Sequence, residues 1–368
     1  MICAKEFIDK FGQIYNFLED QESRETYMAR IHYLITGDFG YYRRIIHKYL
    51  ADVPPINGTA FDELLLTPPA ADGRKIVLYG TGDVGRLLFH SVYKDDKRFI
   101  GFCSRNKEKQ KYGFLGYPVM APEELLKQKS FNVVISADDC GKRRNRTEIR
   151  RILLDGGYPG EQIYEFDKRK EGIQRYDPSL YFAPDFIKYQ EEEILIDGGC
   201  YNLDSALEMR RHSKNLKKVY AFEPDPISYK HCLAVQQETG FEQVKMIQAG
   251  TWNSKTTLSF EIGNDGGSSL AKTGEISVPV VTIDETVMPE DRITYIKLDV
   301  EGAELESLEG ARITIQKYKP KLAVCLYHKP EDLITLPLYI KGLVPEYKLY
   351  VRHHSNVPEE TVLYAVIP

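Results

Sequence analysis

The chain has 368 residues, which is too long for one average domain and predicts two or three. Apolar residues make up 42% of the sequence and charged residues 28%, as is typical of proteins with substantial cores. The formal net charge of -5 disfavours a dedicated nucleic-acid binder, because such domains are usually strongly basic. No apolar run approaches the roughly 18 residues that a membrane-spanning helix needs.

The six cysteines are scattered and form no CxxC pair. That pattern fits reduced thiols better than a disulfide framework or a zinc site. The opening segment MICAKEFIDKFGQIYNFLED carries acids and aromatics where a signal peptide would have a basic stretch and then an apolar core. We therefore expect a cytoplasmic protein.

Residues 1–70 are expected to form a helical N-terminal segment. Apolar side chains recur there at helical spacing in two runs. The runs are Phe7, Phe11, Ile14, Phe17 and Leu18, and then Tyr27, Ile31, Leu34 and Ile35. Asp20 can cap the second helix, because its carboxylate can accept an otherwise unpaired backbone N–H. The stretches ADVPPING and LTPPAADG then interrupt the pattern and indicate a linker.

Residues 71–170 are expected to form a Rossmann-like, nucleotide-binding-type α/β domain. The strands predicted are KIVLYG, FIGFCS and NVVISA, and helices are predicted between them at GRLLFHSVY and APEELLKQ. The charged, turn-rich segment KRKEGIQRYDPS marks a boundary near residue 170.

The segment YGTGDVG places Gly80, Gly82 and Gly85 in GxGxxG spacing between a strand and a helix. Such glycines let the backbone approach a pyrophosphate at the helix N-terminus. An NAD-binding fold also needs an acid about 20 residues later, and the second strand ends in GFCSRN without one. Three interpretations stay open: an NAD(P)-dependent oxidoreductase using residues 75–166, a nucleotide or nucleotide-sugar site, or a tight turn that only closes the fold.

A second α/β series fills residues 171–368. Its strands are expected at ILIDGG, KVYAFEPD, VKMIQAG, TLSFEI, ITYIKLD, KLAVCLYH, KLYVRHH and TVLYAVIP. Asp197 ends the first strand, Gly199 follows it, and Glu223 ends the second. S-adenosylmethionine carries no phosphate, so its site needs an acid near its cationic amino-acid end and another that accepts both ribose hydroxyls. Asp197 and Glu223 can serve these roles; a helix cap and an exposed strand-end acid are the alternatives.

Residues 193–368 resemble the FkbM family of S-adenosylmethionine-dependent methyltransferases. The segments that carry the resemblance are IDGGCYNLDS, AFEPDP, TIDE, IKLDVEGAELESLEGA and the closing YKLYVRHHS and ETVLYAVIP. The resemblance implies a seven-stranded class I fold whose last strand is antiparallel to the rest, preceded by a smaller Rossmann-like domain. It also implies cofactor contacts at the carboxyl ends of the strands that begin at Ile194, Val219 and Val244. The residues expected to make them are Asp197, Gly199, Tyr201, Glu223, Pro224, Gln248 and Ala249.

One position departs from the family pattern. Where a further glycine is usual, this chain has Leu203. A leucine there either narrows the cofactor loop or bends it differently if the position needs a positive φ.

The segment YIKLDVEGAELESLEGA is expected to present catalytic groups, because Asp299 ends the fourth core strand and Glu301 follows it. Three roles stay open for this pair: general base or hydroxyl acceptor, helix cap, or ligands of a divalent metal. His328, the obvious extra donor, ends the next strand and is expected to line the substrate mouth or act as a base with a near-neutral pKa. We expect no metal, and Glu306 and Glu309 are expected to face solvent.

The sequence thus predicts an O-methyltransferase that acts on a sugar, a glycan or another polyhydroxylated metabolite. The expected partners are a small-molecule or glycan substrate, without nucleic acid or membrane insertion, and a homo-oligomer is an option. Besides the oxidoreductase, a non-catalytic nucleotide-sugar-binding or scaffold protein is the alternative.

Overall fold

The computed structural model describes residues 4–36, 41–42, 44, 48–49, 72–137, 145–165, 178–261, 269–270, 276–355 and 359–367. The chain divides into two compact units, Met1–Ile31 with Arg175–Pro368, and His32–Gln174. The predicted linker and the predicted boundary near residue 170 lie largely outside the described residues. The division into domains at residues 70 and 170 stays a prediction.

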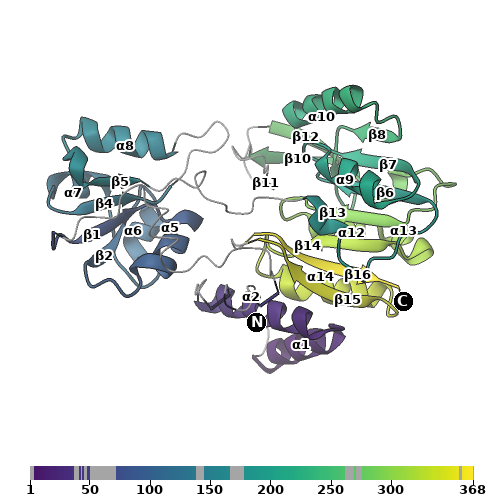
Figure 1. The fold of residues 1–368 in the computed structure, drawn as a ribbon, viewed down its shortest axis with the longest axis horizontal. Coiled ribbons are helices and arrows are strands. Elements are labelled where there is room, and N and C mark those ends of the chain that lie inside the picture. The colour runs from purple at the N-terminus through teal and green to yellow at the C-terminus, as the bar shows by residue number, and fades with distance from the viewer. Residues whose placement is uncertain are drawn as a thin grey trace. The chain divides into compact units, whose positions relative to one another are not determined.

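The His32–Gln174 unit contains a five-stranded parallel sheet. Its strands are β1 (Ile76–Tyr79), β2 (Phe99–Cys103), β3 (Val119–Met120), β4 (Asn132–Ile135) and β5 (Ile163–Glu165), in the order β3-β2-β1-β4-β5. The helices are α5 (Asp83–Leu88), α6 (Lys107–Tyr112), α7 (Pro122–Lys127) and α8 (Asn145–Asp155), and a π-helical turn (Phe89–Tyr93) continues α5. The three predicted strands and the Rossmann-like parallel sheet are confirmed (Figure 1).

The larger unit is built on a seven-stranded sheet. Its strands are β6 (Glu193–Gly198), β7 (Leu216–Phe222), β8 (Val244–Ile247), β13 (Tyr295–Leu298), β14 (Lys321–Cys325), β15 (Lys348–His353) and β16 (Thr361–Val366). Their order is β15-β16-β14-β13-β6-β7-β8, and β16 runs antiparallel to both of its neighbours. The predicted fold class, with its antiparallel last strand, is confirmed.

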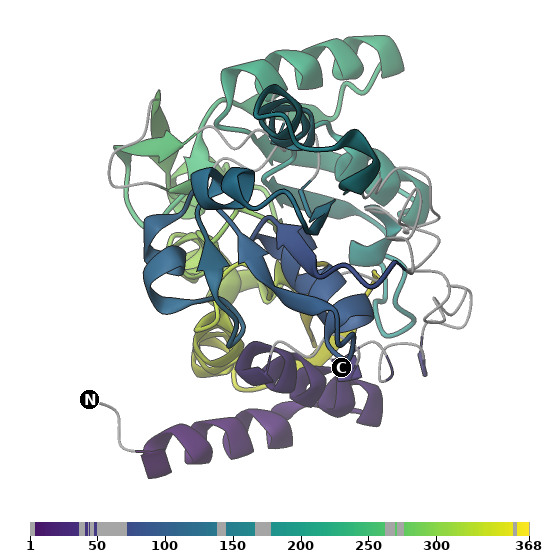
Figure 2. The same cartoon turned by 90° about the vertical axis from the view of Figure 1, so that its left-hand side faces the viewer.

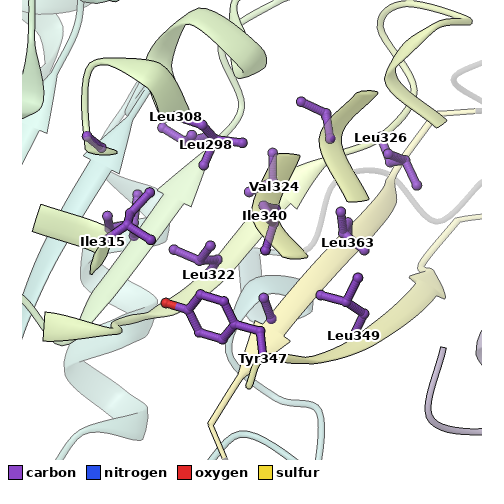
Figure 3. Close-up of a cluster of buried hydrophobic side chains, with 14 of the residues drawn as sticks. Leu298, Leu308, Ile315, Leu322, Val324, Leu326, Ile340, Tyr347, Leu349 and Leu363 are labelled. Atoms are coloured by element: carbon purple, nitrogen blue, oxygen red, sulfur yellow. The ribbon is translucent and has the colours of Figure 1, made fainter. Parts of the chain in front are cut away.

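Alternate side chains of these strands enter two separate cores. In β14, Leu322 and Val324 face one core, and Ala323 and Cys325 face the other. The first core is covered by α1 (Ala4–Phe17), α12 (Glu304–Glu309), α13 (Arg312–Tyr318) and α14 (Asp332–Leu343). Figure 3 shows part of this core, with Leu322 and Val324 of β14. The second is covered by α9 (Asp204–His212), α10 (Pro226–Thr239) and the 3₁₀ turn Pro178–Tyr181. Burial on both faces explains the apolar runs at residues 194–196 of β6 and 322–325 of β14.

A small second sheet is inserted between β8 and β13. It contains β9 (Gly250–Thr251), β10 (Thr256–Glu261), β11 (Ser269–Leu270) and β12 (Ile276–Val281), in the order β11-β10-β12-β9. The predicted strand TLSFEI lies in this sheet as β10, outside the seven-stranded one. The short helix α11 (Ile283–Thr286) then leads towards β13.

The N-terminal helices α1 (Ala4–Phe17) and α2 (Gln21–Thr36) begin the chain, and Met1–Ile31 packs within the larger unit. Leu18 forms a parallel bridge with Leu349 of the edge strand β15. Asp20 caps α2 as predicted, since its Oδ1 accepts the backbone N–H of Ser23 at 2.9 Å. The same carboxylate accepts bonds from Arg352 at 2.6 and 3.1 Å. Figures 1 and 2 both show α1 beside the C-terminal elements.

Two further expectations concern cysteines and membranes. Cys103, Cys200, Cys232 and Cys325 are buried free thiols, whereas Cys3 and Cys140 lie outside the described residues. Within the described part of the chain, no helix has both the length and the apolar character that crossing a bilayer requires.

Candidate functional site

The loop after β6 has an unusual backbone. Gly199, Tyr201 and Leu203 have φ values of +71°, +49° and +66°. A Cβ built on Gly199 would overlap the backbone carbonyl oxygen of Asp299. Glycine is therefore needed at this position both for its φ and because the loop meets the end of β13 without space for a side chain.

Leu203 adopts the positive φ of the glycine it replaces. Its side chain is fully buried in the second core, with Ala206 and Met209 among the core's members. The side chain therefore packs inward and does not narrow the loop. The left-handed backbone costs about 1–2 kcal/mol in a non-glycine residue, and burial of the side chain offsets that cost.

Glu223 follows β7 directly and connects it to the loop after β6. Its Oε2 accepts the backbone N–H of Tyr201 at 3.0 Å, and its Oε1 accepts that of Asp225 at 2.8 Å. Burial raises the pKa of Glu223 to about 7, although both backbone bonds favour the ionised form. A carboxylate has about four lone-pair sites, so each oxygen retains capacity for a ligand hydroxyl.

Asp197 is fully buried and already paired. Its Oδ1 lies 3.2 Å from Nζ of Lys297, and its Oδ2 accepts the hydroxyl of Ser205 at 2.6 Å. Lys297 also donates to the backbone carbonyl of Gly199 at 2.7 Å. The ion pair of Lys297 with Asp197 joins β13 to the neighbouring strand β6. Asp197 therefore holds the loop in this structure, and its contact with a cofactor stays a prediction.

The other predicted cofactor residues lie at the same edge of the sheet. Tyr201 is 49% exposed, Pro224 follows Glu223 after β7, and the exposed Gln248 and buried Ala249 follow β8. Because β6, β7 and β8 are parallel neighbours, their carboxyl ends meet at one edge. The structure brings these residues together as expected, and their contacts with a cofactor stay predictions.

Asp299 and Glu301 lie on either side of His328. Nε2 of His328 is 3.5 Å from Oδ1 of Asp299 and 3.4 Å from Oε2 of Glu301. Asp299 also accepts the hydroxyls of Tyr181 at 2.9 Å and Tyr327 at 3.3 Å. The structure thus joins the three predicted catalytic residues, and adds two tyrosines that sequence reasoning missed.

Glu304 is a site residue that sequence reasoning did not single out. It begins α12, where an acid is expected to be solvated, yet it is fully buried. Its Oε1 lies 2.8 Å from Nδ1 of His328 and accepts the backbone N–H of Val300 at 3.0 Å. Asp299, Glu304 and His328 each place one donor atom within 4.8 Å of the others, a spacing that a metal ion could bridge. The sequence contained no signal for this burial, because it depends on a histidine 24 residues away.

The charges in this cluster shift the pKa values in different directions. Burial alone would raise the pKa of Asp299, but the charges of Lys297 and His328 and the Tyr181 hydroxyl lower it below its ordinary value. Burial, opposed by His328, raises the pKa of Glu301. Burial disfavours a charged His328, yet the bond to Glu304 and the surrounding carboxylates raise its pKa to about 9. Without a ligand, His328 is therefore an imidazolium at neutral pH, which differs from the near-neutral base expected.

The backbone at the end of β13 is strained. Glu301 has a φ of +55° and Gly302 one of +94°. A left-handed glutamate costs about 1–2 kcal/mol and persists only where surrounding structure imposes it. The carboxylates expected to be solvated are half-buried: Glu306 Oε2 is 3.9 Å from Lys329 Nζ, and Glu309 accepts Asn253 Nδ2 at 2.8 Å.

Close packing accounts for two of the three glycines in the YGTGDVG motif. A Cβ on Gly80 would overlap the backbone of Ser136, and one on Gly85 would overlap the carbonyl of Gly80. Only Gly82 has no atom within 4 Å of a Cβ built on it. Arg105, after β2, pairs with Glu148 at 3.0 Å. A nucleotide site at this turn stays a prediction.

Comparison with known families gives one match. Residues 197–351 match the model described as Methyltransferase FkbM domain, which confirms the resemblance. A search of curated proteins finds no significant match.

Solved structures similar to this chain include methyltransferases. A methyltransferase FkbM from Methylobacillus flagellatus KT is 18% identical with a TM-score of 0.49, over 89% of this chain and 99% of that one. An rRNA methylase from Streptococcus thermophilus is 17% identical with a TM-score of 0.33, over 49% and 89%. SMU.1697c from Streptococcus mutans, in complex with SAH, is 13% identical with a TM-score of 0.32, over 47% and 89%.

Proposed function

Because residues 197–351 belong to the FkbM methyltransferase family, we propose that this chain transfers a methyl group from S-adenosylmethionine to a hydroxyl of a sugar, glycan or other polyhydroxylated metabolite. One observation carries the proposal. The loop after β6 is tied on one side to Glu223, through the N–H of Tyr201, and on the other side to Asp299, through the close approach of Gly199. The acid assigned to the cofactor and the acid assigned to the substrate therefore flank a single loop.

The residues present fit the cofactor at its ribose. Glu223 is a buried carboxylate with an unused lone pair on each oxygen, the arrangement that accepts two vicinal hydroxyls. Each hydrogen bond to a charged group contributes about 1.5–3 kcal/mol. When bound, S-adenosylmethionine would supply a methyl group attached to a sulfonium, and the neutral thioether would be the leaving group. The protein has to align the acceptor, exclude water and receive a proton.

The carboxylates after β13 provide the acceptor side. Asp299, held by the Tyr181 and Tyr327 hydroxyls, accepts the hydrogen bond of the substrate hydroxyl. Glu301 lies across His328, is 41% exposed at its side chain, and takes the hydroxyl proton. His328, anchored by Glu304, keeps the two carboxylates apart. Proton removal of this kind accelerates a reaction about 10²–10⁴-fold.

The proposed setting is the cytoplasm, with a small-molecule or glycan substrate and no nucleic acid. The four buried free thiols of the described residues and the net charge of -5 support this setting.

Calorimetric titration with S-adenosylhomocysteine tests the cofactor assignment. We expect micromolar binding, which Glu223→Ala weakens about tenfold or more, corresponding to at least about 1.4 kcal/mol. The exposed Glu242 provides a matched control, and Glu242→Ala should leave binding unchanged. Binding of NAD without binding of S-adenosylhomocysteine would overturn the proposal in favour of an oxidoreductase.

The acceptor side is tested by Asp299→Asn and Glu301→Gln. Both should lower turnover on a hydroxylated acceptor by about 10²-fold or more while leaving S-adenosylhomocysteine affinity within about threefold. Glu309→Gln on α12 is the control and should retain turnover. If both variants fail to fold, the two carboxylates have a structural role instead.

A further inference from the structure

Three segments that are far apart in the chain bring metal-type donors to one place. Asp299 follows β13, Glu304 begins α12 and His328 follows β14, and one donor atom from each lies within 4.8 Å of the others. Convergence of hard oxygen and imidazole donors from separate segments is the arrangement that a bound cation requires. Glu301 lies at the rim of this group, with its carboxylate 41% exposed.

The bonding of the imidazole leaves Nε2 available, and this nitrogen can bind a cation once the cation displaces its proton to solvent. Glu304 Oε1 engages Nδ1 at 2.8 Å, which fixes the orientation of the ring. The His328 side chain is only 10% exposed, and Nε2 is buried with no hydrogen-bond partner in the described parts of the chain. A carboxylate that holds one nitrogen of a histidine so that the other can bind a metal is a common second-sphere arrangement in proteins.

The distances around Nε2 fit a shared ion better than direct hydrogen bonds. An N–H···O bond to a carboxylate is about 2.7–3.2 Å long, whereas Asp299 Oδ1 and Glu301 Oε2 lie 3.5 and 3.4 Å from Nε2. Two ligands at about 2.1 Å from a tetrahedral ion are about 3.4 Å apart. The pair of His328 Nε2 and Asp299 Oδ1 therefore has the spacing of two atoms that coordinate the same ion.

The local charge also favours a cation. Oε2 of the fully buried Glu304 has no hydrogen-bond partner among the residues that the structure describes. The carboxylates of Asp299 and Glu304 thus surround a place where a cation would be stabilised.

We propose that His328 and Asp299 bind a divalent first-row transition metal, with Glu304 orienting the imidazole and Glu301 remaining at the rim as the proton acceptor. A mixed set of carboxylate and imidazole suits Zn²⁺ or Mn²⁺, whereas Mg²⁺ and Ca²⁺ prefer oxygen ligands alone. If the proposed methyl transfer holds, on which this further role rests, the ion binds the substrate hydroxyl and makes it easier to deprotonate. Metal binding itself does not require that function.

The experiment is a titration of the metal-free full chain with Mn²⁺, without cofactor or substrate. The electron paramagnetic resonance signal of free Mn²⁺ decreases as the ion binds, so the decrease gives the number of bound ions. We expect one bound ion per chain. Electron spin echo modulation should show a coupled imidazole nitrogen in the wild type. His328→Gln and Asp299→Asn should each weaken binding at least about tenfold, and Glu304→Gln about 10–100-fold. Glu309→Gln, in the same helix as Glu304, is the matched control and should bind like the wild type.

Three results would overturn the inference: no bound Mn²⁺, bound Mn²⁺ without nitrogen coupling, or binding that Asp299→Asn and His328→Gln leave unchanged. The wild-type spectrum alone decides the matter if a variant does not fold. The proposed methyl transfer is judged separately, by S-adenosylhomocysteine binding that depends on Glu223. Either proposal can therefore fail while the other stands.

Discussion

Leu203 shows how a single residue can keep a glycine's backbone without being glycine. Its φ of +66° is unfavourable, and its side chain is fully buried in the core under α9. Strain and packing therefore act in opposite directions at one position. Substitutions that remove the side chain separate the two effects.

We predict that Leu203→Gly is more stable than Leu203→Ala. Both lose the buried side chain, at about 2–5 kcal/mol, but only alanine retains the left-handed strain of about 1–2 kcal/mol. At a site with ordinary φ the order would be reversed, because glycine is usually the less stable of the two by about 0.5–1 kcal/mol. Urea unfolding of both variants measures the difference, and an alanine variant as stable as the glycine one would contradict the assigned strain.

The raised pKa of Glu223 predicts that the affinity for S-adenosylhomocysteine depends on pH. Burial raises its pKa to about 7, above the ordinary value of 4.5, so the carboxyl is largely protonated at pH 6 and ionised at pH 8. Only the ionised form makes charge-assisted bonds to ribose hydroxyls, so S-adenosylhomocysteine affinity should rise up to about tenfold between these values. Without ligand, the stability of the protein changes with pH in the opposite direction. The folded protein retains the Glu223 proton up to a higher pH than the unfolded chain does, so the free energy of unfolding falls as the pH rises from 4.5 to 7. Calorimetry should show that the S-adenosylhomocysteine affinity of Glu223→Gln does not change between pH 6 and pH 8. If the variant keeps the pH dependence of the wild type, another group is responsible for it.

At the scale of elements, the loop after β6 is in contact with the end of β13. Gly199 leaves no space for a side chain next to Asp299, and Lys297 of β13 donates to the Gly199 carbonyl. The geometry of each strand end is therefore set partly by the other.

Gly199→Ala should be far more disruptive than a glycine substitution that introduces strain alone. The added methyl must displace the backbone of Asp299, so we expect losses in stability, in S-adenosylhomocysteine affinity and in turnover together. Gly240 has a similar φ of +59° with nothing within 4 Å of a Cβ, so Gly240→Ala should cost only about 1–2 kcal/mol. Equal unfolding free energies for the two variants would show that the loop moves independently of β13.

The elements themselves were largely predictable, whereas their side-chain pairings were not. The strands near Ile76 and Ile194 are short, continuously apolar runs followed by glycine or acid, and such runs indicate buried parallel strands. The burial of Glu304 and the pairing of Lys297 with Asp197 depend on neighbours in other strands and helices. A local pattern contains no information on such contacts, and the same holds for the docking of α1.

On the scale of the whole molecule, the N-terminal helices are part of the larger unit's structure. β15 is an edge strand, and Leu18, Glu19 and Ser23 pair with its backbone at Leu349 and Val351. Covering an edge in this way blocks pairing with other chains.

Two isoleucines of α1 test whether this docking stabilises the fold. Ile14 is fully buried and Ile8 is 67% exposed. Ile14→Ala should cost about 2–5 kcal/mol, and Ile8→Ala should change stability by no more than about 0.5 kcal/mol. Urea unfolding followed by circular dichroism measures the stability of each variant. If Ile14→Ala and Ile8→Ala change the free energy of unfolding of the larger unit equally, α1 is not part of its cooperative structure.

The pairing of Ser23 and Asp20 with β15 also sets an order of events during synthesis. The hydrogen bonds that join them span 328 to 332 residues, so α1 and α2 emerge from the ribosome long before their partner strand exists. At about 5–20 residues per second, that interval lasts tens of seconds. The His32–Gln174 unit, whose sheet lies entirely within its own stretch of chain, emerges complete in the meantime. The seven-stranded sheet can close only after β16 has been translated, because β15 joins the sheet through β16. Until α14 and β15 have been translated, α1 lacks the elements that it packs against in the folded protein.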